Sequence, residues 1–237
     1  MSLRSESFNW LEMSRAVSAL EAAIVGAEVA EIRLHDEVID FEAAVDASNK
    51  GRTGEHFRKS LNTLPPSRFL GVSGWASDGR VLFTTANRYD DIGGWDLQRY
   101  IREFWGRCYV GVDGAPARLH DDAAAFARGR QGPFVYIGET FVDPALSGGN
   151  VAAHLVRMCI LISCMKWSPA YIYGWMVPKH AFKGLGLRWG FTEFYSSALR
   201  WQVPPATAAY EDLCFLGCTP AGVRQILRSP LLELQRS

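Results

Sequence analysis

Residues 147 to 152 read Ser-Gly-Gly-Asn-Val-Ala, a composition that could bind an anion. The glycines Gly148 and Gly149 would let the backbone approach a ligand closely. The first N–H groups of a helix that begins near Asn150 lack intrahelical acceptors and point outward at its positive end. We therefore predict a site for a phosphate or pyrophosphate on these N–H groups. The alternative is an ordinary turn that binds nothing.

Three polar residues would share one face of that helix. Asn150, His154 and Arg157 are spaced by four and three residues, which places them one above the other beside the predicted anion site. They either line the phosphates of the ligand or form a solvated face over the first two turns.

The neighbouring elements give this turn its place in a fold. An apolar run, residues 151 to 167, follows it, and Ser168-Pro169 separates this run from a buried strand at 170 to 177. Another strand ends near Val142, just before the turn. The order strand, helix, strand predicts two parallel neighbouring strands joined by a right-handed crossover.

From about residue 133 to 201, the chain is similar to the acyl-CoA-binding half of the GNAT superfamily of N-acetyltransferases. The family has a strand ending in a Val-Asp-Pro-like corner, a glycine loop, a helix, a strand, and a short helix with a Leu-Gly-Phe-like turn. The matching segments here are 142 to 144, 147 to 152 and 188 to 191. The resemblance implies an α/β fold of the acyl-CoA N-acyltransferase type, with a mixed central sheet flanked by helices.

The resemblance also implies a co-substrate, acetyl-CoA or another acyl-CoA, that enters between the two parallel strands where they diverge. A backbone N–H near the end of the first strand would polarise the thioester carbonyl, and the loop would hold the pyrophosphate. The residues implied in binding are Phe141, Val142, Ser147, Gly148, Gly149, Asn150, Val151 and Ala152.

The chain departs from the family pattern at three positions. Ser147 stands where the family usually has Arg or Gln, and Asn150 stands where it usually has a second glycine. The family's frequent tyrosine, a general acid four residues before the glycine of the Gly-Phe turn, is replaced by Gly186.

Acyl transfer to an amine requires a base for the amine and an acid for the departing thiolate. We predict Glu139 as the base, because it lies on the strand before the corner, where family members often carry an acidic residue; a solvated carboxylate is the alternative. Tyr173, Tyr195 and His180 are the candidates for the acid.

The resulting hypothesis is an acyl-CoA-dependent N-acyltransferase acting on a small amine or an amino-acid-like acceptor. The alternative is a GNAT-like ligand-binding or assembly domain without catalysis, which the altered loop and the missing tyrosine favour. A nucleotide-binding α/β protein is a weaker alternative, since no acidic ribose partner follows on the next strand.

The composition and the residue pattern indicate which partners and which cellular compartment to expect. Lys and Arg number 25 and Asp and Glu number 25, so nucleic acid is not an expected partner. The apolar run at 151 to 167 contains His154, Arg157 and Lys166, so we expect a buried helix and not a membrane span. The first residues lack the pattern of a secretory signal, so we expect a cytoplasmic protein.

Cys214 and Cys218 have no second metal-ligand pair nearby, and we expect no metal.

We expect a single domain over 1–237 with a helical insertion at about 87–131. Helices are predicted at 9–25, 39–63, 96–107, 121–128 and 220–227, and strands at 27–34, 68–75, 81–85 and 211–216. The insertion is rich in aromatic residues. It would form a substrate wall or an apolar tunnel for a longer acyl chain, an additional packing layer, or the contact of a homodimer.

Overall fold

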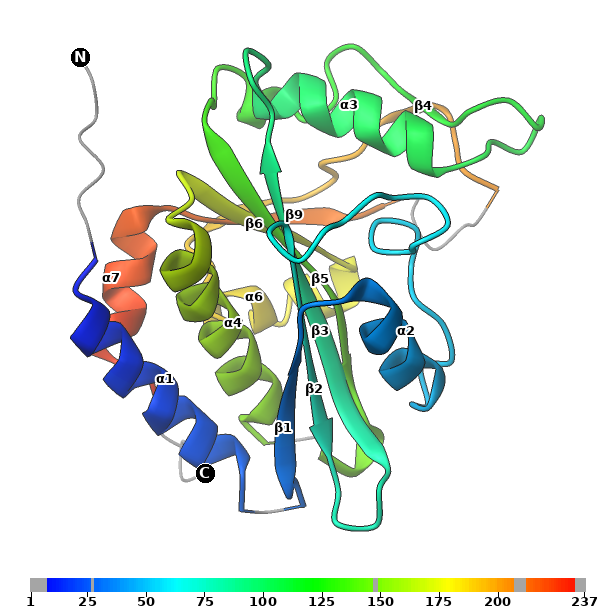
Figure 1. Ribbon diagram of the computed structural model, residues 1–237. Coiled ribbons are helices and arrows are strands. Elements are labelled where there is room, and N and C mark those ends of the chain that lie inside the picture. Colours follow the sequence, from blue (N-terminus) through cyan, green and yellow to red (C-terminus); the bar gives the residue numbers. More distant parts are fainter. Residues whose placement is uncertain (1–7, 27, 147–148, 207–211, 233–237) are drawn as a thin grey trace.

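The computed structural model describes residues 8–26, 28–146, 149–206 and 212–232. A seven-stranded mixed sheet forms its centre (Figure 1), in the order β1-β2-β3-β5-β6-β9-β7. The strands are β1 (Glu31–His35), β2 (Phe69–Trp75), β3 (Val81–Asp91), β5 (Pro133–Val142), β6 (Tyr171–Met176), β9 (Cys214–Cys218) and β7 (Glu193–Tyr195). Helices flank this sheet, so the predicted mixed α/β fold is confirmed.

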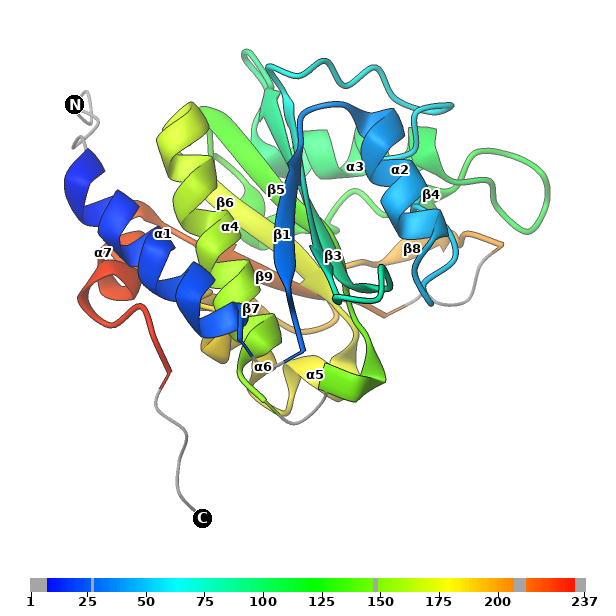
Figure 2. The same ribbon diagram turned by 60° about the horizontal axis from the view of Figure 1, so that its bottom comes forward.

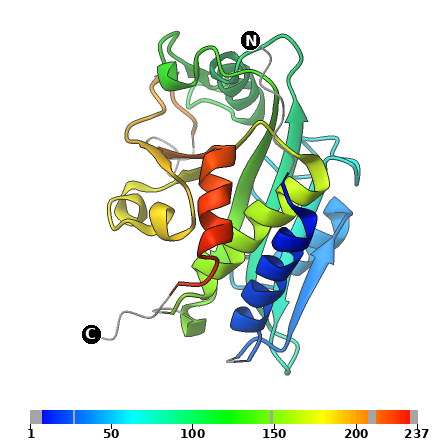
Figure 3. The ribbon, with the colours of Figure 1, turned by 90° about the vertical axis from the view of Figure 1, so that its left-hand side faces the viewer.

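One face of the sheet carries the helices α1 (Trp10–Ile24), α4 (Val151–Trp167) and α7 (Pro220–Arg228), as Figure 3 shows. The helix α1 begins at Trp10 because the side chain of Asn9 accepts hydrogen bonds from the first free N–H groups, those of Leu11 and Glu12. The helices α2 (Val38–Asp46) and α3 (Leu97–Cys108) lie on the opposite side (Figure 2).

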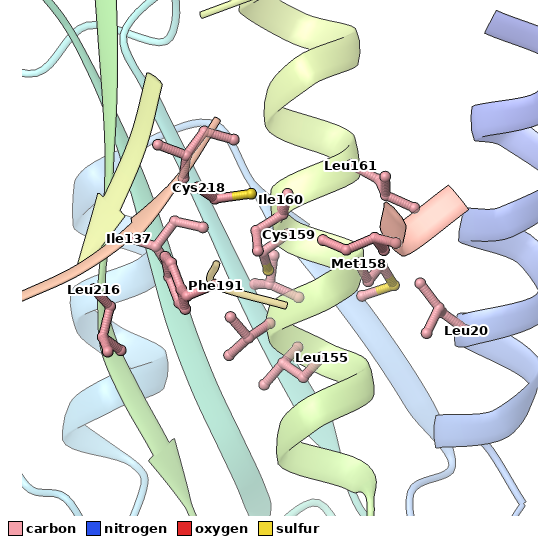
Figure 4. Packing of buried hydrophobic residues seen from close by; sticks show 14 of the residues in the cluster. Leu20, Ile137, Leu155, Met158, Cys159, Ile160, Leu161, Phe191, Leu216 and Cys218 are labelled. Carbon is pink, nitrogen blue, oxygen red and sulfur yellow. The ribbon is translucent and has the colours of Figure 1, made fainter. Parts of the chain in front are cut away.

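Helix α4 is apolar around most of its circumference because it lies between other elements on both sides. In Figure 4, Met158 and Leu161 point toward Leu20 of α1, while Leu155 and Cys159 lie on the side of the sheet. These side chains are all buried. A helix enclosed in this way needs no polar face, which explains the long apolar run.

Strands β5 and β6 pair in parallel, as predicted, and they separate before they end. Their ladder runs from Phe134 opposite Tyr171 to Ile137 opposite Gly174, and β5 then continues to Val142. On the other side of β5, the antiparallel register with β3 shifts at a β-bulge. The backbone therefore opens between β5 and β6 at their carboxyl ends.

The segment before β2 differs from the prediction of helices at 39–63. Helix α2 ends at Asp46, and residues 47 to 64 form turns. Gly51 has a φ of 79°, a conformation that a helix cannot contain. The turns bring this segment alongside β5.

The predicted insertion also differs in detail. Strand β3 continues to Asp91, so the segment at 87–91 belongs to the sheet. Only a 3-10 turn (Ala125–Ala127) forms where a helix at 121–128 was predicted. Two short strands, β4 (Arg118–Leu119) and β8 (Trp201–Val203), form a second sheet that the sequence analysis did not predict.

Helix α3 packs its apolar residues on the main sheet. Leu97, Ile101 and Phe104 join a buried cluster with Tyr171 and Phe215 from strands β6 and β9. The insertion thus supplies an additional packing layer over the carboxyl half of the sheet. No helix among the described residues is long and apolar enough to span a lipid bilayer.

Candidate functional site

A cleft of about 490 Å³ opens where β5 and β6 part. Strand β5 contributes residues 136 to 140 to its wall, and β6 contributes residues 174 to 176. Turns at 50 to 56 form one rim. The short helices α5 (Pro178–Ala181) and α6 (Leu185–Arg188) follow β6 at the same end of the sheet, as Figure 2 shows.

Glu139 lies in this cleft at the bulge of β5. Its φ of 58° belongs to the left-handed region, which is unusual for a residue with a side chain. The carboxylate accepts a hydrogen bond from the backbone N–H of Gly54 at 3.0 Å and forms an ion pair with Lys50. Only 9% of the Glu139 side chain is exposed, so the predicted base is in the cleft but is paired and not solvated.

Gly54 lets the two segments come together. A β-carbon at this position would lie 2.6 Å from Oε1 of Glu139, which is closer than side chains tolerate. The glycine therefore allows its own N–H to reach the carboxylate directly.

Arg88 on β3 connects the turns before β2 to the sheet. Its guanidinium pairs with buried Asp90 at 2.9 Å and donates to the carbonyl oxygen of His56 and to the side chain of Asn62, each at 3.0 Å. Since the Arg88 and Asp90 side chains are almost fully buried, removing either one would leave the other as an uncompensated buried charge.

His56 is a cleft residue that the sequence analysis missed. Its ring lies among Phe104, Tyr109 and Tyr136, with ring centroids 4.8, 5.6 and 5.1 Å away. Burial first, and then the charge of Arg88, hold the pKa of His56 well below its usual range. The imidazole is therefore neutral at pH 7. A lone histidine in a segment that reads as helical carries no local signal of this role.

The tyrosine candidates for the acid belong to the aromatic cluster under α3. Tyr173 is 4% exposed and stacks between Tyr136 and Phe215 in the cluster under α3. Burial raises the pKa of Tyr173 well above its usual value. Tyr195 stacks on Phe126 at 4.3 Å in the same region. Neither tyrosine is among the residues that line the cleft.

His180 does line the cleft. Partial burial, together with the charges of Lys179 and Lys183, lowers the pKa of His180. This histidine is therefore mainly neutral at pH 7, a state suited to accepting a proton.

Asn150, His154 and Arg157 on α4 contact the segment at 229 to 232, and not the ligand phosphates or the solvent that the sequence analysis offered as alternatives. Arg157 donates to the carbonyl oxygens of Ser229 and Pro230 at 2.8 and 2.9 Å. His154 accepts the N–H of Leu232 at 3.2 Å, and Asn150 donates to the carbonyl oxygen of Leu232 at 3.1 Å. These side chains hold the segment at 229 to 232, so they neither point at an anion site nor form a solvated face.

Among the described residues, no hydrogen bond caps the backbone N–H groups at the start of α4. The side chain of Asn150 does not cap the helix. Its amide oxygen instead accepts a hydrogen bond from the guanidinium of Arg188. Val151 and Ala152 are half-buried and begin the helix. Gly149 is exposed and does not adopt a positive φ. Ser147 and Gly148 lie outside the described residues.

The corner before this turn is well ordered by hydrogen bonds. Asp143 accepts the N–H of Ala145 at 2.9 Å and the amide of Asn49 at 2.6 Å. Both bonds, the first more than the second, lower the pKa of Asp143. Phe141 and Val142 are half-buried, and Val142 packs against the core under α1 and α4.

Leu216 occupies the space beside the position of the missing tyrosine. A β-carbon on Gly186 would lie 2.7 Å from Cδ2 of Leu216. Leu216 also lines the cleft, so a tyrosine at position 186 would have to displace a leucine from the cleft wall.

The described part of the chain contains no group of three or more His, Cys, Asp or Glu side chains placed to hold a metal ion. The five cysteines are buried thiols. Burial raises the pKa of Cys159 and of Cys218 to about 12, so these thiols are unreactive core residues.

No protein-family model and no curated protein matches the sequence. Solved structures do resemble the fold. An N-acyl amino acid synthase, FeeM from uncultured soil microbes, has a TM-score of 0.46 and 14% identity over 85% of this chain and 94% of its own. Arabidopsis thaliana NAA60 in complex with acetyl-CoA has a TM-score of 0.46 and 12% identity, over 81% of this chain and 99% of its own. The GNAT domain of S. lividans PAT has a TM-score of 0.41 and 12% identity, over 79% of this chain and 89% of its own.

The chain resembles the GNAT superfamily in its fold. The resemblance rests on features of this structure: the element order from β5 through β7, the bulge in β5, and the parallel pair that opens at its carboxyl end.

Proposed function

We propose that this protein is an acyl-CoA-dependent N-acyltransferase that acts on a small amine or an amino-acid-like acceptor. The observation that carries the proposal is the cleft between β5 and β6, which has Glu139 in its wall and lies at the end of the sheet where α4 begins. An extended thioester arm can enter between strands that no longer pair, with its phosphates at the helix start.

In this proposal, the N–H groups at Gly149 to Ala152, together with those at Ser147 and Gly148, bind the pyrophosphate of acetyl-CoA or another acyl-CoA. Phe141 and Val142 lie beside the thioester, whose carbonyl a backbone N–H near Val142 polarises.

Glu139 accepts the proton of the attacking amine, directly or through a water molecule. Lys50 and the N–H of Gly54 hold the Glu139 side chain in position at the cleft wall. His56 lines the same cleft as a neutral imidazole, but its strongly lowered pKa makes it a weaker proton acceptor than an ordinary histidine.

The departing thiolate needs a proton, and the geometry favours His180 over Tyr173 for this step. His180 lines the cleft, whereas Tyr173 is enclosed under α3. Because the pKa of His180 is lowered, its imidazole is neutral before the reaction. An acceptor that arrives as an ammonium gives one proton to Glu139 before attack and a second proton to His180 after attack, and His180 passes that second proton to the departing thiolate.

Arg52 supports an acceptor that carries a carboxylate. Its side chain is exposed at the cleft rim, and within the described ranges no ion pair or hydrogen bond engages its guanidinium. Glu139 and Glu55, the acidic residues of the cleft, already pair with Lys50 and Arg58. An amino acid presents a carboxylate next to its amine and would find this cation available.

A second candidate function is a GNAT-like domain that binds a ligand without catalysis. The filled tyrosine position, where Leu216 packs against Gly186, favours it. We also propose a homodimer, which a native mass measurement would test, and a cytoplasmic location, which cell fractionation would test.

The deciding experiment combines binding with turnover. Calorimetry with CoA and acetyl-CoA measures binding, and release of free thiol over a panel of amines and amino acids measures transfer. Binding with thiol release supports the acyltransferase. Binding without release over the whole panel supports the ligand-binding domain, and absence of binding to both thioester and free CoA rejects both functions.

A further inference from the structure

A row of cross-strand neighbours leads away from the point where β5 and β6 part. Gly174 lies opposite Ile137 on β5 and opposite Leu216 on β9, and Leu216 lies opposite Phe194 on β7. Directly opposite residues of neighbouring strands point to the same face of a sheet. The row therefore runs along one face from the cleft to the β7 edge, and at Gly174 it has no side chain.

The row ends at a second cavity, of about 260 Å³, between the sheet and the helices α5 and α6. We call it the apolar chamber. Its wall includes Phe182, Gly186, Leu187 and Phe194. Phe191 and Leu216 line both the chamber and the main cleft, so these two side chains form the partition between them.

The residues that line the chamber are almost all apolar. Glu193 is the one charged residue among those that line it. Its carboxylate accepts hydrogen bonds from Arg130 at 2.7 Å and from the hydroxyl of Tyr171 at 2.8 Å. Because Tyr171 belongs to the cluster under α3, the carboxylate is directed to the opposite face of the sheet.

Two glycines make the chamber accessible. Gly174 leaves its position in the row empty next to the ring of Phe191, which a β-carbon there would approach to 3.4 Å. Gly186 lets α6 pass close to Leu216 without filling the space above it. Phe191 and Leu216 are therefore the residues that the cleft and the chamber share.

We propose that the apolar chamber receives the hydrocarbon chain of the acyl donor, and that the preferred donor is a medium-chain acyl thioester and not acetyl-CoA. This inference rests on the proposed acyl-CoA site. The sequence analysis placed an acyl tunnel in the aromatic insertion, but the helix of that insertion packs on the sheet. The acyl chain would instead occupy the space under α5 and α6. Leu216 separates the thioester from the chamber and sets how the chain passes.

Direct binding tests the chamber without requiring turnover. Acetyl-, butanoyl-, hexanoyl-, octanoyl- and decanoyl-CoA are compared by calorimetry, and each added CH₂ group that enters the chamber should tighten binding by up to about fourfold. Affinity that is flat or falls from acetyl to octanoyl overturns the chamber. If CoA binds with an acetyl group alone, the proposed function stands and the inference fails; if no thioester binds, both fail.

Variants at the rim keep the test independent of folding. Leu187 is 66% exposed and Phe182 is 69% exposed, so Leu187→Gln and Phe182→Gln should fold normally and reduce the gain per CH₂ group. Leu11→Gln, on α1 and 60% exposed, is the matched control and should leave the series unchanged. Leu216→Ala should move the preference to longer chains. An unchanged chain-length series in both rim variants overturns the proposal.

Discussion

The carboxylate of Glu139 joins the bulge of β5 to the turns before β2, because its Oε2 accepts the N–H of Gly54 at 3.0 Å. The same oxygen pairs with Lys50. This arrangement gives Glu139 two roles in one position: it keeps the rim at 50 to 56 in place, and it presents its side chain at the cleft.

We expect Glu139→Gln to lower turnover at neutral pH by about a hundredfold or more, the usual scale for a lost general base. The amide can still accept the N–H of Gly54, so the rim should stay in place. Steady-state rates with an acyl-CoA and a verified acceptor measure the effect. Glu42→Gln is the matched control, since Glu42 accepts the N–H of Lys59 at 2.8 Å outside the cleft. Wild-type turnover in Glu139→Gln would remove Glu139 from the mechanism.

The sequence was sufficient to predict the elements whose signals are local. Helix α4 has the predicted bounds, 151 to 167, because an apolar run between a Gly-Gly turn and Ser168-Pro169 leaves little choice. The parallel pairing of β5 and β6 followed from the order strand, helix, strand. Hydrophobic periodicity and the crossover rule were enough for both.

The cleft rim could not be predicted, because long-range contacts build it. The segment at 47 to 64 has helix-compatible residues, yet it follows the path set by Arg88 and Glu139, which are distant in sequence. Likewise, Asn150 and its neighbours on α4 have the spacing of a ligand face, but they bind the carbonyl and N–H groups of Leu232. Spacing shows which side chains share a face and not what covers that face.

We expect Gly149→Val to fold normally and to lose CoA binding. Gly149 has no positive φ, and a β-carbon there would meet only the carbonyl oxygen of Leu146, at 3.9 Å. A branched side chain would instead occupy the approach of the pyrophosphate. Calorimetry with CoA measures the loss, and Gly94→Val, another glycine with open surroundings and no positive φ, is the control. Unchanged affinity in a folded Gly149→Val protein would reject the site.

We expect Gly186→Ala to lower the free energy of unfolding by about 1–3 kcal/mol, because the added β-carbon would lie 2.7 Å from Leu216. Leu216→Ala alone should cost about 2–5 kcal/mol through the cavity it leaves. The double variant should lose less than the sum of the two, since the smaller residue at 216 removes the clash. Urea denaturation measures all three. Strict additivity would show that the two side chains do not compete for space.

We expect Arg52→Ala to raise KM for an amino-acid acceptor by about tenfold, the scale of a lost hydrogen bond to a charged group. KM for the matching decarboxylated amine should not change, because that amine has no carboxylate for Arg52 to bind. Arg80→Ala is the control, since Arg80 pairs with Asp78 in an exposed hairpin. An equal rise in KM for both acceptors would mean that Arg52 shapes the rim without recognising the carboxylate.

We expect the stability of the protein to fall as the pH drops below about 6.5, the ordinary pKa of histidine. Partial burial, followed by the charges of Arg157 and Arg188, lowers the pKa of His154 in the folded protein. The unfolded chain therefore binds more protons in the window just below pH 6.5, and the free energy of unfolding rises with pH across it. Above that window the contribution is fully present.

His154 also connects this titration to one segment. Its Nε2 accepts the N–H of Leu232 at 3.2 Å, and a protonated imidazole cannot accept it. Hydrogen exchange at Leu232 should thus accelerate, relative to the core of α4, as the pH falls from 7.5 to 5.5. His154→Gln, which does not titrate, should flatten both this change and part of the stability profile, whereas His120→Gln, at an exposed position, should leave both as they are. The same pH dependence in wild type and His154→Gln would show that other groups control the 229 to 232 segment.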